Sequence, residues 1–379
     1  MIGRTAIERP LRVAVIGVGY LGKFHARILS RLEGVQLVGV VDPVAAHREA
    51  VARDCGTQAL ADWRPLIGNL DAAVVATPTQ FHHDVGTELL ARGVHLLIEK
   101  PLASTVAQAD ALVAAARQAR VVLQVGHVER FNPALALVQP HLDEPKYLTA
   151  SRLSAFKFRS ADIGVVLDLM IHDIDLVLSL VRAPLRTVEA LGVSIFGDHE
   201  DAATARLTFE NGAVAQLEAS RCSYESLRRL NVWTPRAFAS IDLGGGSARL
   251  LRPRDLLVQR AFRVDALSAD DAERLKTSLF DELFCDEPLR AEPLDQLTAE
   301  LTDFVDSIRT GRSPRVPGEQ GREALAVAQR VLEAVARHAW DGRADGRHGA
   351  HAIPPPRIVP APHFDHARTQ SPPVRREAG

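Results

Sequence analysis

One stretch of the chain places three ionisable side chains at helical spacing among apolar residues. Asp168, His172 and Asp175 follow one another at steps of four and three, and Leu, Met, Ile and Val fill most positions between them. On an α-helix these steps place all three side chains on one face. A carboxylate one turn away can orient an imidazole and raise its basicity, so the pattern predicts a general base for an alcohol proton.

Two other interpretations fit Asp168 and His172. A buried histidine and aspartate can simply satisfy each other's hydrogen bonds in a core. The spacing Asp-x-x-x-His beside another acid also occurs in metal sites. Lys100, described next, favours the catalytic interpretation, because an active site brings several ionisable groups into one cleft. We therefore expect no metal.

The second candidate group is Glu99-Lys100-Pro101, which directly follows the apolar run 94–98. The order predicts an ionisable pair at the carboxyl edge of a buried strand, with a proline that fixes the turn. A lysine held there can share a proton with a substrate hydroxyl. A surface salt bridge at a strand end is the alternative, and a cis bond before Pro101 would aim the lysine into the cleft.

The elements that must position these groups begin with residues 13–22, Val-Ala-Val-Ile-Gly-Val-Gly-Tyr-Leu-Gly. A buried strand is followed by Gly17, Gly19 and Gly22 in the G-x-G-x-x-G spacing that opens a dinucleotide-binding helix. The glycines permit the tight turn, the close approach of a pyrophosphate and the packing of the helix on its strand. The same turn carries two further expected cofactor contacts, Tyr20 and Leu21.

A second strand, 35–41, follows at the distance expected in a βαβ unit and ends in Asp42. A carboxylate there can accept hydrogen bonds from both ribose hydroxyls and would repel a 2′-phosphate. The sequence therefore predicts NAD in preference to NADP. Asp42 can also be a plain turn or capping residue before Pro43.

Strand-like and helix-like segments alternate up to Gly126, which predicts an α/β Rossmann domain with a doubly wound parallel sheet over residues 11–126. Ligands of such sheets bind outside the carboxyl ends of the strands. The remaining residues predicted to line the cofactor cleft are Thr77, Pro78, His82, Glu99 and Lys100. For the first three, a turn with helix-capping groups is the alternative.

From residue 127 to 340, longer segments predict an α+β domain with a large open, mainly antiparallel sheet. The expected strands are 147–159, 188–195, 202–209, 213–219 and 230–241, and the expected helices are 294–309 and 318–340. Arg152 and Arg159 on the first strand can bind a phosphate or lie on a solvated sheet face. One face of the sheet needs a cover, which predicts association of subunits.

The composition bounds the remaining possibilities. The chain has 379 residues, 46% hydrophobic residues and a formal net charge of −2, as in a globular protein of two domains with no affinity for nucleic acid. Three scattered cysteines predict a reducing compartment without disulfides. Neither a secretion signal nor a membrane-spanning run is found, so we expect a cytoplasmic protein. The segments left are an N-terminal extension 1–10, an irregular lid-like stretch 245–293 and a disordered tail 341–379.

In family order, the glycine turn, Glu99-Lys100-Pro101, Arg130-Phe131-Asn132-Pro133 and the segment 164–175 resemble the Gfo/Idh/MocA family of oxidoreductases over about residues 10 to 340. The resemblance implies a Rossmann domain followed by an α+β domain, dimers or tetramers, and NAD(P)-dependent oxidation of a sugar hydroxyl. It places Lys100, Asp168 and His172 at the family's catalytic positions. Many members carry a run of glycines where this chain has Gly164-Val165-Val166.

Within the family, the motifs look like those of the branch that oxidises the 3-hydroxyl of UDP-N-acetylglucosamine, a step toward the diamino sugar of lipid A. A dehydrogenase of free sugars or inositols and a non-catalytic NAD-sensing protein are the alternatives. For the nucleotide-sugar interpretation, the expected substrate contacts are Arg130, Asn132, Arg152, Arg159 and Asp175.

Overall fold

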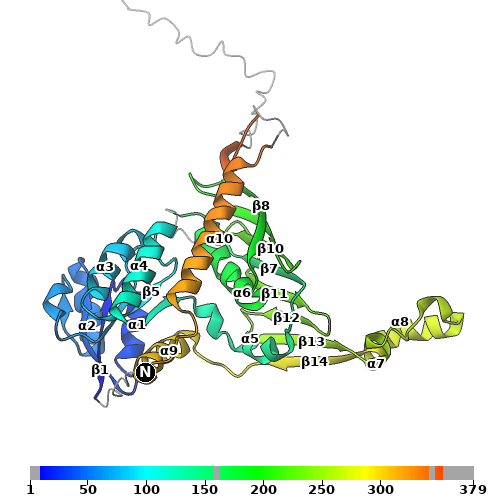
Figure 1. The fold of residues 1–379 in the computed structure, drawn as a ribbon, viewed down its shortest axis with the longest axis horizontal. Helices are drawn as coiled ribbons and strands as arrows, with labels where there is room; N and C mark the ends of the chain where they lie inside the picture. Colours follow the sequence, from blue (N-terminus) through cyan, green and yellow to red (C-terminus); the bar gives the residue numbers. More distant parts are fainter. Residues whose placement is uncertain (1–8, 157–162, 341–345, 353–379) are drawn as a thin grey trace, which may run out of the picture.

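The first third of the chain forms the predicted parallel sheet. In the computed structural model, which describes residues 9–156, 163–340 and 346–352, its six strands lie in the order β3-β2-β1-β4-β5-β6 (Figure 1). The strands are β1 (Leu11–Ile16), β2 (Val35–Val41), β3 (Ala59–Leu60), β4 (Ala72–Val75), β5 (His95–Glu99) and β6 (Leu123–Gly126). The helices between them are α1 (Gly22–Leu29), α2 (Ala45–Cys55), α3 (His82–Leu90) and α4 (Val106–Ala119). The doubly wound α/β prediction is confirmed.

The second sheet has eight strands in the order β14-β13-β12-β11-β7-β10-β9-β8. Only β7 and β10 run parallel to each other, so the sheet is mainly antiparallel as predicted. Its strands are β7 (Tyr147–Leu153), β8 (Leu185–Val193), β9 (Ala202–Phe209), β10 (Val214–Ser220), β11 (Leu227–Trp233), β12 (Phe238–Asp242), β13 (Ser247–Pro253) and β14 (Phe284–Arg290).

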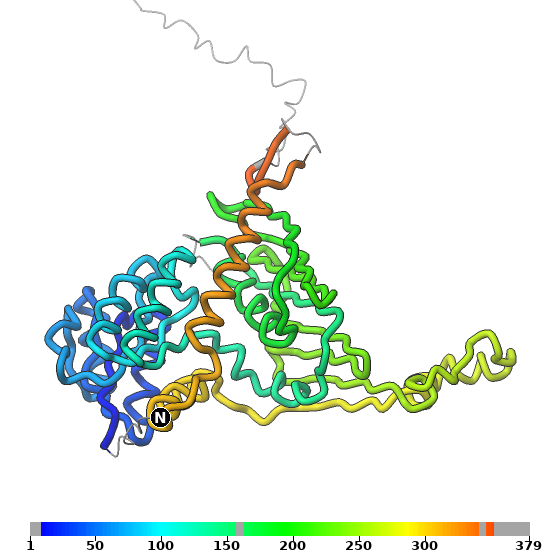
Figure 2. The backbone as a smooth tube through the Cα atoms, in the orientation of Figure 1, coloured from blue at the N-terminus to red at the C-terminus, as the bar shows by residue number. Residues whose placement is uncertain are grey.

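Two expectations for this sheet were wrong in detail. The stretch 230–241 is two strands, because Thr234 and Ala237 close a turn through a 2.8 Å backbone hydrogen bond. The stretch 245–293 contains strands β13 and β14. Between them, α7 (Asp255–Val258) and α8 (Ala269–Leu283) form an arm that extends away from both sheets (Figure 2).

Helices α5 (Pro133–Val138), α6 (Ile171–Val181) and α10 (Gly318–Arg337) share a core with one face of the second sheet. Helix α9 (Gln296–Thr310) instead returns to the Rossmann sheet, where Leu301 and Phe304 are buried with Val13 and Val15 of β1. The expected domain limits put α9 in the second domain, whereas its apolar face completes the core of the first.

The helix that carries His172 does not begin as a regular α-helix. Residues Val166–Met170 form a π-helical turn that runs into α6. Glu200 holds its start, since its Oε1 accepts a 3.0 Å hydrogen bond from the amide of Val166. A Cβ at Gly164 would lie 2.0 Å from the same Oε1. A glycine is therefore needed where Glu200 reaches the helix start.

Parts of three expectations lie outside the described residues: the N-terminal extension at 1–8, the tail at 341–345 and 353–379, and Arg159. Within the described ranges, no helix is both long and apolar enough to cross a membrane.

Candidate active site

The glycine turn has the geometry that its spacing predicts. Gly17 has a φ of +86°, a conformation that favours glycine. A Cβ at Gly22 would lie 1.8 Å from the carbonyl oxygen of Gly17, so only glycine allows α1 to start so close to the turn. A Cβ at Gly19 would meet no protein atom within 4 Å, and α1 has no side-chain cap. An uncapped helix start beside open space suits the pyrophosphate of a dinucleotide.

Asp42 ends β2 at this turn. Its Oδ2 accepts a 3.0 Å hydrogen bond from the amide of Val18, and its Oδ1 accepts one of 2.9 Å from Val44. The carboxylate thus ties the glycine turn to the start of α2, which is the turn role considered above. Each carboxylate oxygen can accept a second hydrogen bond, so Asp42 keeps the capacity to bind ribose hydroxyls.

A hollow of about 700 Å³ lies beside the turn, and its lining includes Gly19, Tyr20 and His47. Leu21, the other expected contact, is 43% exposed but does not line this hollow. The open volume and the uncapped helix together fit a bound dinucleotide.

The turn after β4 is held from behind by His82. The ring nitrogens of His82 lie 2.8 Å from the carbonyl oxygen of Thr77 and 3.0 Å from that of Pro101. Burial lowers the pKa of His82, although both carbonyls favour its charged form. Because both nitrogens are engaged, the prediction that His82 contacts the cofactor is not supported. Thr77 Oγ1, in the same turn before Pro78, is buried without a protein partner and is the polar atom left for a ligand.

Glu99 is also engaged from behind. It is 8% exposed, and its Oε1 lies 2.7 Å from Nε2 of the buried His25 on α1. Burial alone would raise the pKa of Glu99, but His25 and the charge of Lys100 outweigh it and hold the pKa below its ordinary value. Glu99 therefore supports the turn through His25, and its expected contact with the cofactor stays a prediction.

Lys100 reaches across to the second domain. The Lys100–Pro101 bond is cis. The Lys100 Nζ donates to the carbonyl oxygen of Asp168 at 2.8 Å and to its Oδ1 at 3.2 Å. An ammonium group has three N–H bonds, so one donor is left for a substrate oxygen.

Asp168 and His172 do not form the expected hydrogen bond. The carboxylate of Asp168 is bonded to Lys100, and the Nδ1 of His172 is buried with no hydrogen-bond partner in the described part of the chain. The π-helical turn at Asp168 explains the difference, because it winds by i→i+5 spacing and shifts the two side chains out of the alignment of an α-helix. Asp168 thus positions Lys100 and not the imidazole.

His172 is held in its neutral form. Burial lowers its pKa well below the ordinary value, and the positive charges of Lys100 and Arg152 lower it further. A neutral imidazole can accept a proton from an alcohol. Its neighbour is His127, whose ring lies edge to face with it at a centroid separation of 6.3 Å.

The expected phosphate contact Arg152 is committed to the protein. It is 4% exposed, donates to both oxygens of Asp173 at 2.9 and 2.8 Å, and donates to Glu129 Oε1 at 2.8 Å. Burial disfavours its charge, but these carboxylates outweigh burial and raise its pKa. Three N–H groups of Arg152 are therefore engaged by acidic side chains of the protein, and its expected contact with substrate stays a prediction.

Asn132, another expected substrate contact, also has its partners within the protein. Asn132 is 1% exposed, caps α5 by accepting from the amide of Ala134 at 3.0 Å, and donates to Glu129 and to the carbonyl of Leu243. These protein partners engage the Asn132 amide, and its expected contact with substrate stays a prediction.

Arg130 and Asp175 form a pair of their own. Arg130 Nη1 donates to Asp175 Oδ1 at 3.2 Å, and Asp175 is 2% exposed. The Asp175 Oδ2 is buried without a protein partner. The charges of both residues act on His127, and their expected contact with substrate stays a prediction.

Arg228 is the cation that sequence reasoning missed. It stands opposite Arg152 in the register of β7 and β11, and its side chain is 52% exposed. It reaches Glu129 only at 3.5 Å, and its charge also acts on His172. The sequence pattern could have revealed this position. Alternate residues of a strand point to the same face, and Arg228 alternates with the apolar Leu230 and Val232, which are buried toward the helices.

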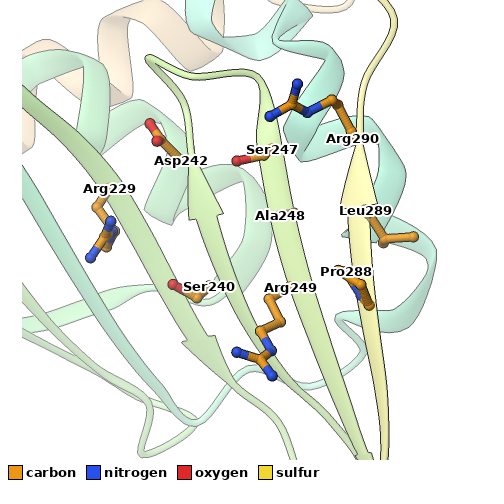
Figure 3. Close-up of a pocket in the computed structure, with 9 residues that line it drawn as sticks. All are labelled: Arg229, Ser240, Asp242, Ser247, Ala248, Arg249, Pro288, Leu289 and Arg290. Atoms are coloured by element: carbon orange, nitrogen blue, oxygen red, sulfur yellow. The ribbon is translucent and has the colours of Figure 1, made fainter.

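On the opposite face of the second sheet, strands β11 to β14 line a separate hollow of about 370 Å³, shown in Figure 3. Arg229, next to Arg228 in sequence, lines it together with Asp242 and Arg249. Successive strand residues point to opposite faces, so this hollow is not part of the site around Lys100 and His172.

Two family models match the chain. The model described as "Oxidoreductase family, NAD-binding Rossmann fold" (Gfo/Idh/MocA) matches residues 11–127, and the Gfo/Idh/MocA C-terminal domain matches residues 134–237. Among curated relatives, UDP-N-acetylglucosamine 3-dehydrogenase of Acidithiobacillus ferrooxidans is 37% identical, over 86% of this chain and 97% of its own. The scyllo-inositol 2-dehydrogenase (NAD(+)) of Bacillus subtilis is 29% identical over 57% of this chain and 69% of its own.

Solved structures give the same fold. A structure of the Acidithiobacillus ferrooxidans enzyme superposes with a TM-score of 0.75 and 36% identity, covering 86% of this chain and 97% of that chain. Levoglucosan dehydrogenase in complex with NADH superposes with a TM-score of 0.72 over 86% of this chain and 97% of that chain; its 18% identity supports the fold alone.

Proposed function

The chain belongs to the Gfo/Idh/MocA oxidoreductase family, and from that premise we propose that it oxidises the 3-hydroxyl of UDP-N-acetylglucosamine with NAD. Its 37% identity to an enzyme of that name, over 97% of that enzyme, carries the proposal. The product would be the 3-keto sugar that a transaminase needs to make a diamino sugar such as that of lipid A.

The glycine turn, Asp42 and the start of α1 would hold the dinucleotide. Bound NAD supplies a hydride acceptor for the carbinol carbon. His172, neutral and close to Lys100, takes the hydroxyl proton. Lys100 uses its third N–H to bind the reacting oxygen and stabilise the negative charge that develops there. Asp168 holds the ammonium of Lys100 in place through its carbonyl and carboxylate oxygens.

Arg228 is the proposed contact for the diphosphate. It is half-exposed, its partner Glu129 is already bound to Arg152, and its charge acts on His172. Arg228→Gln should raise the KM for UDP-N-acetylglucosamine about tenfold, as expected for one lost charge-assisted hydrogen bond. Arg229→Gln, on the opposite face, should leave the KM unchanged. Equal KM values for the two variants would exclude this role.

The direct test of the activity is a substrate panel. The purified protein would be incubated with NAD or NADP and with UDP-N-acetylglucosamine, UDP-glucose, UDP-N-acetylglucosaminuronate, inositol or glucose, with the reduced cofactor followed by absorbance. An aminotransferase with glutamate would draw off a 3-keto product. Turnover confined to UDP-N-acetylglucosamine with NAD is the expected result.

The other outcomes assign the alternatives. Turnover on inositol or glucose alone would make the protein a dehydrogenase of free polyols, which its inositol dehydrogenase relative keeps open. Tight NAD binding without turnover on any sugar would favour an NAD-sensing protein. Equal rates with NADP would contradict the proposed role of Asp42.

We also propose that copies of the chain associate through the open face of the second sheet. This face carries a row of aromatic rings, with Tyr147 to Trp233 at 4.9 Å and Trp233 to Phe238 at 4.7 Å between centroids. A dimer or tetramer in sedimentation experiments that Trp233→Glu dissociates would support it. A cytoplasmic location agrees with the three free cysteines.

A further inference from the structure

His127 occupies a position that the proposed mechanism leaves unused. It directly follows β6 at the carboxyl edge of the Rossmann sheet and is completely buried. Its amide donates to the carbonyl of Val125 at 2.8 Å, and its own carbonyl accepts from the amide of Arg130 at 3.0 Å. The backbone therefore fixes the ring against His172, edge to face with an interplanar angle of 89°.

Both ring nitrogens of His127 are buried without a hydrogen-bond partner among the residues that the structure describes. The Nδ1 of His172 and the Oδ2 of Asp175 share this condition. Buried polar atoms are normally satisfied, because leaving them unpaired is costly. His127, His172 and Asp175 therefore each have an unsatisfied polar atom, which a purely structural core would not be expected to contain. Together they indicate a path for a proton.

The charges around His127 define the direction of the path. Burial lowers the pKa of His127, and the positive charges of Lys100 and Arg130 lower it further. The negative charges of Asp175 on α6 and Glu99 on β5 act in the opposite sense. A proton on His127 is thus attracted toward Asp175. Arg130 donates both to Asp175 and, at 3.1 Å, to Gln320 Oε1, so it anchors the carboxylate without carrying the proton itself. The proton held at Asp175 therefore leaves by the way it came, through His127 and His172, after the product has left.

We propose that His127 is a proton carrier that takes the substrate proton from His172 and passes it to Asp175. This inference rests on the proposed dehydrogenase function. The substrate O–H bond breaks as an N–H bond forms at Nε2 of His172, and the hydride leaves the same carbinol group for bound NAD. The Nδ1–H of His172 then gives its proton through one water molecule to His127, which gives a proton to the Asp175 carboxylate.

The relay would remove the proton that His172 takes from the substrate. The buried, positively surrounded imidazole of His172 disfavours its own protonated form. A base in that environment returns its proton to the product unless another group removes it. His127 is the neighbouring ring, with 6.3 Å between the two centroids. This separation is too long for a direct hydrogen bond between ring nitrogens, so transfer between the rings needs a bridging water.

The test compares His127→Gln with His95→Gln. His95 is also buried, but it lies at the amino end of β5, where its Nδ1 accepts from the amide of Val122 at 2.9 Å. With UDP-N-acetylglucosamine, we expect His127→Gln to lower kcat about 10- to 100-fold with little change in either KM. The solvent deuterium isotope effect on kcat should rise, and added imidazole should restore part of the rate. His95→Gln should show none of these changes.

Two kinetic results would overturn the relay. An unchanged kcat would show that the proton leaves without His127. A raised KM for NAD with an unchanged kcat would show that His127 holds the cofactor instead.

A second readout keeps this inference separate from the proposed function. In ¹⁵N-histidine NMR of the folded protein, the His172 signals are those lost in His172→Gln. We expect their shifts and titration to change in His127→Gln and to stay the same in His95→Gln. If the wild-type protein turned over no sugar, the proposed function would fail, and this comparison would still decide the relay: unaltered His172 signals in His127→Gln would refute it.

Discussion

The glycine turn after β1 and the helix start at 164–175 both carry recognisable motifs. The structure predicted from the motif is observed at the turn but only in part at the helix start. At the turn, φ of +86° at Gly17 and the 1.8 Å approach at Gly22 match what the spacing requires. At the helix start, a π-helical turn separates Asp168 from His172, and Lys100 from the other domain takes the carboxylate. A motif of backbone conformation is local, whereas a motif of side-chain partners depends on what packs against it.

The largest expected effect lies in the second region. Arg152→Met would leave the carboxylates of Asp173 and Glu129 buried without their cation. Removing one partner of a buried ion cluster costs about 3 to 5 kcal/mol, and urea denaturation would measure the loss. Arg229→Met, at an exposed position of β11, is the control. Unchanged stability with a raised KM for the substrate would restore Arg152 as a ligand and remove the contrast between the two regions.

Lys100→Met tests the contact that replaces the expected Asp168–His172 pair. We expect kcat to fall about 100- to 1000-fold, because the substrate oxygen loses its charged donor. NAD affinity and the free energy of unfolding should change little. Lys146→Met removes a half-exposed lysine elsewhere and should leave the rate intact. If Lys100→Met turned over at the wild-type rate, Lys100 would be a purely structural link between the domains.

Gly19→Ala tests the first region by itself. No protein atom lies within 4 Å of the added Cβ, so only a bound ligand can clash with it. We expect the dissociation constant for NAD to rise about tenfold, as measured by quenching or calorimetry. Thermal stability without NAD should stay at the wild-type value, as it should in Gly197→Ala, where the Cβ also has free space. Undiminished NAD affinity would place the pyrophosphate elsewhere.

The smallest expected effect concerns Glu300, where α9 joins the two regions. Burial raises its pKa well above the ordinary value, and the charges of Glu99 and Asp303 add to the rise. The folded state then keeps a proton that the unfolded state loses as pH rises, so this residue lowers stability with increasing pH. Glu300→Gln should be a few degrees more stable than the wild type at about pH 8 and nearly equal at about pH 4. A difference independent of pH would contradict the buried neutral carboxyl.

Most of the fold could be predicted from the sequence, because apolar and polar residues alternate in the strands and the helices have clear apolar faces. The sequence pattern placed β9 at 202–209, where the structure has it, and predicted a strand at 213–219, where β10 pairs with β9. It missed the return of α9 to the Rossmann sheet. An amphipathic helix shows that it has an apolar face, but not which sheet covers that face.

The candidate site was predictable to a lesser extent. Lys100 is bonded to Asp168, and its charge acts on His172, but no hydrogen bond links His172 to Asp168. Arg152 and Arg228 carry identical side chains on neighbouring strands, and only Arg152 meets two carboxylates. Nothing in the sequence assigns a role to His127, because the lack of partners for its ring nitrogens can be seen only once the neighbouring elements are packed around it.

By itself the sequence determined the Rossmann turn, the acid at the end of β2, the lysine at the end of β5 and the mainly antiparallel second sheet. Each depends on residues close together in the chain, through backbone conformation or side-chain periodicity. The tertiary structure alone decided which charged side chains form ion pairs within the protein and which remain available to a ligand. Hydrogen bonds and ion pairs act over a few ångströms, so their partners are fixed only when distant segments such as 99–101, 127–132, 152 and 164–175 come together.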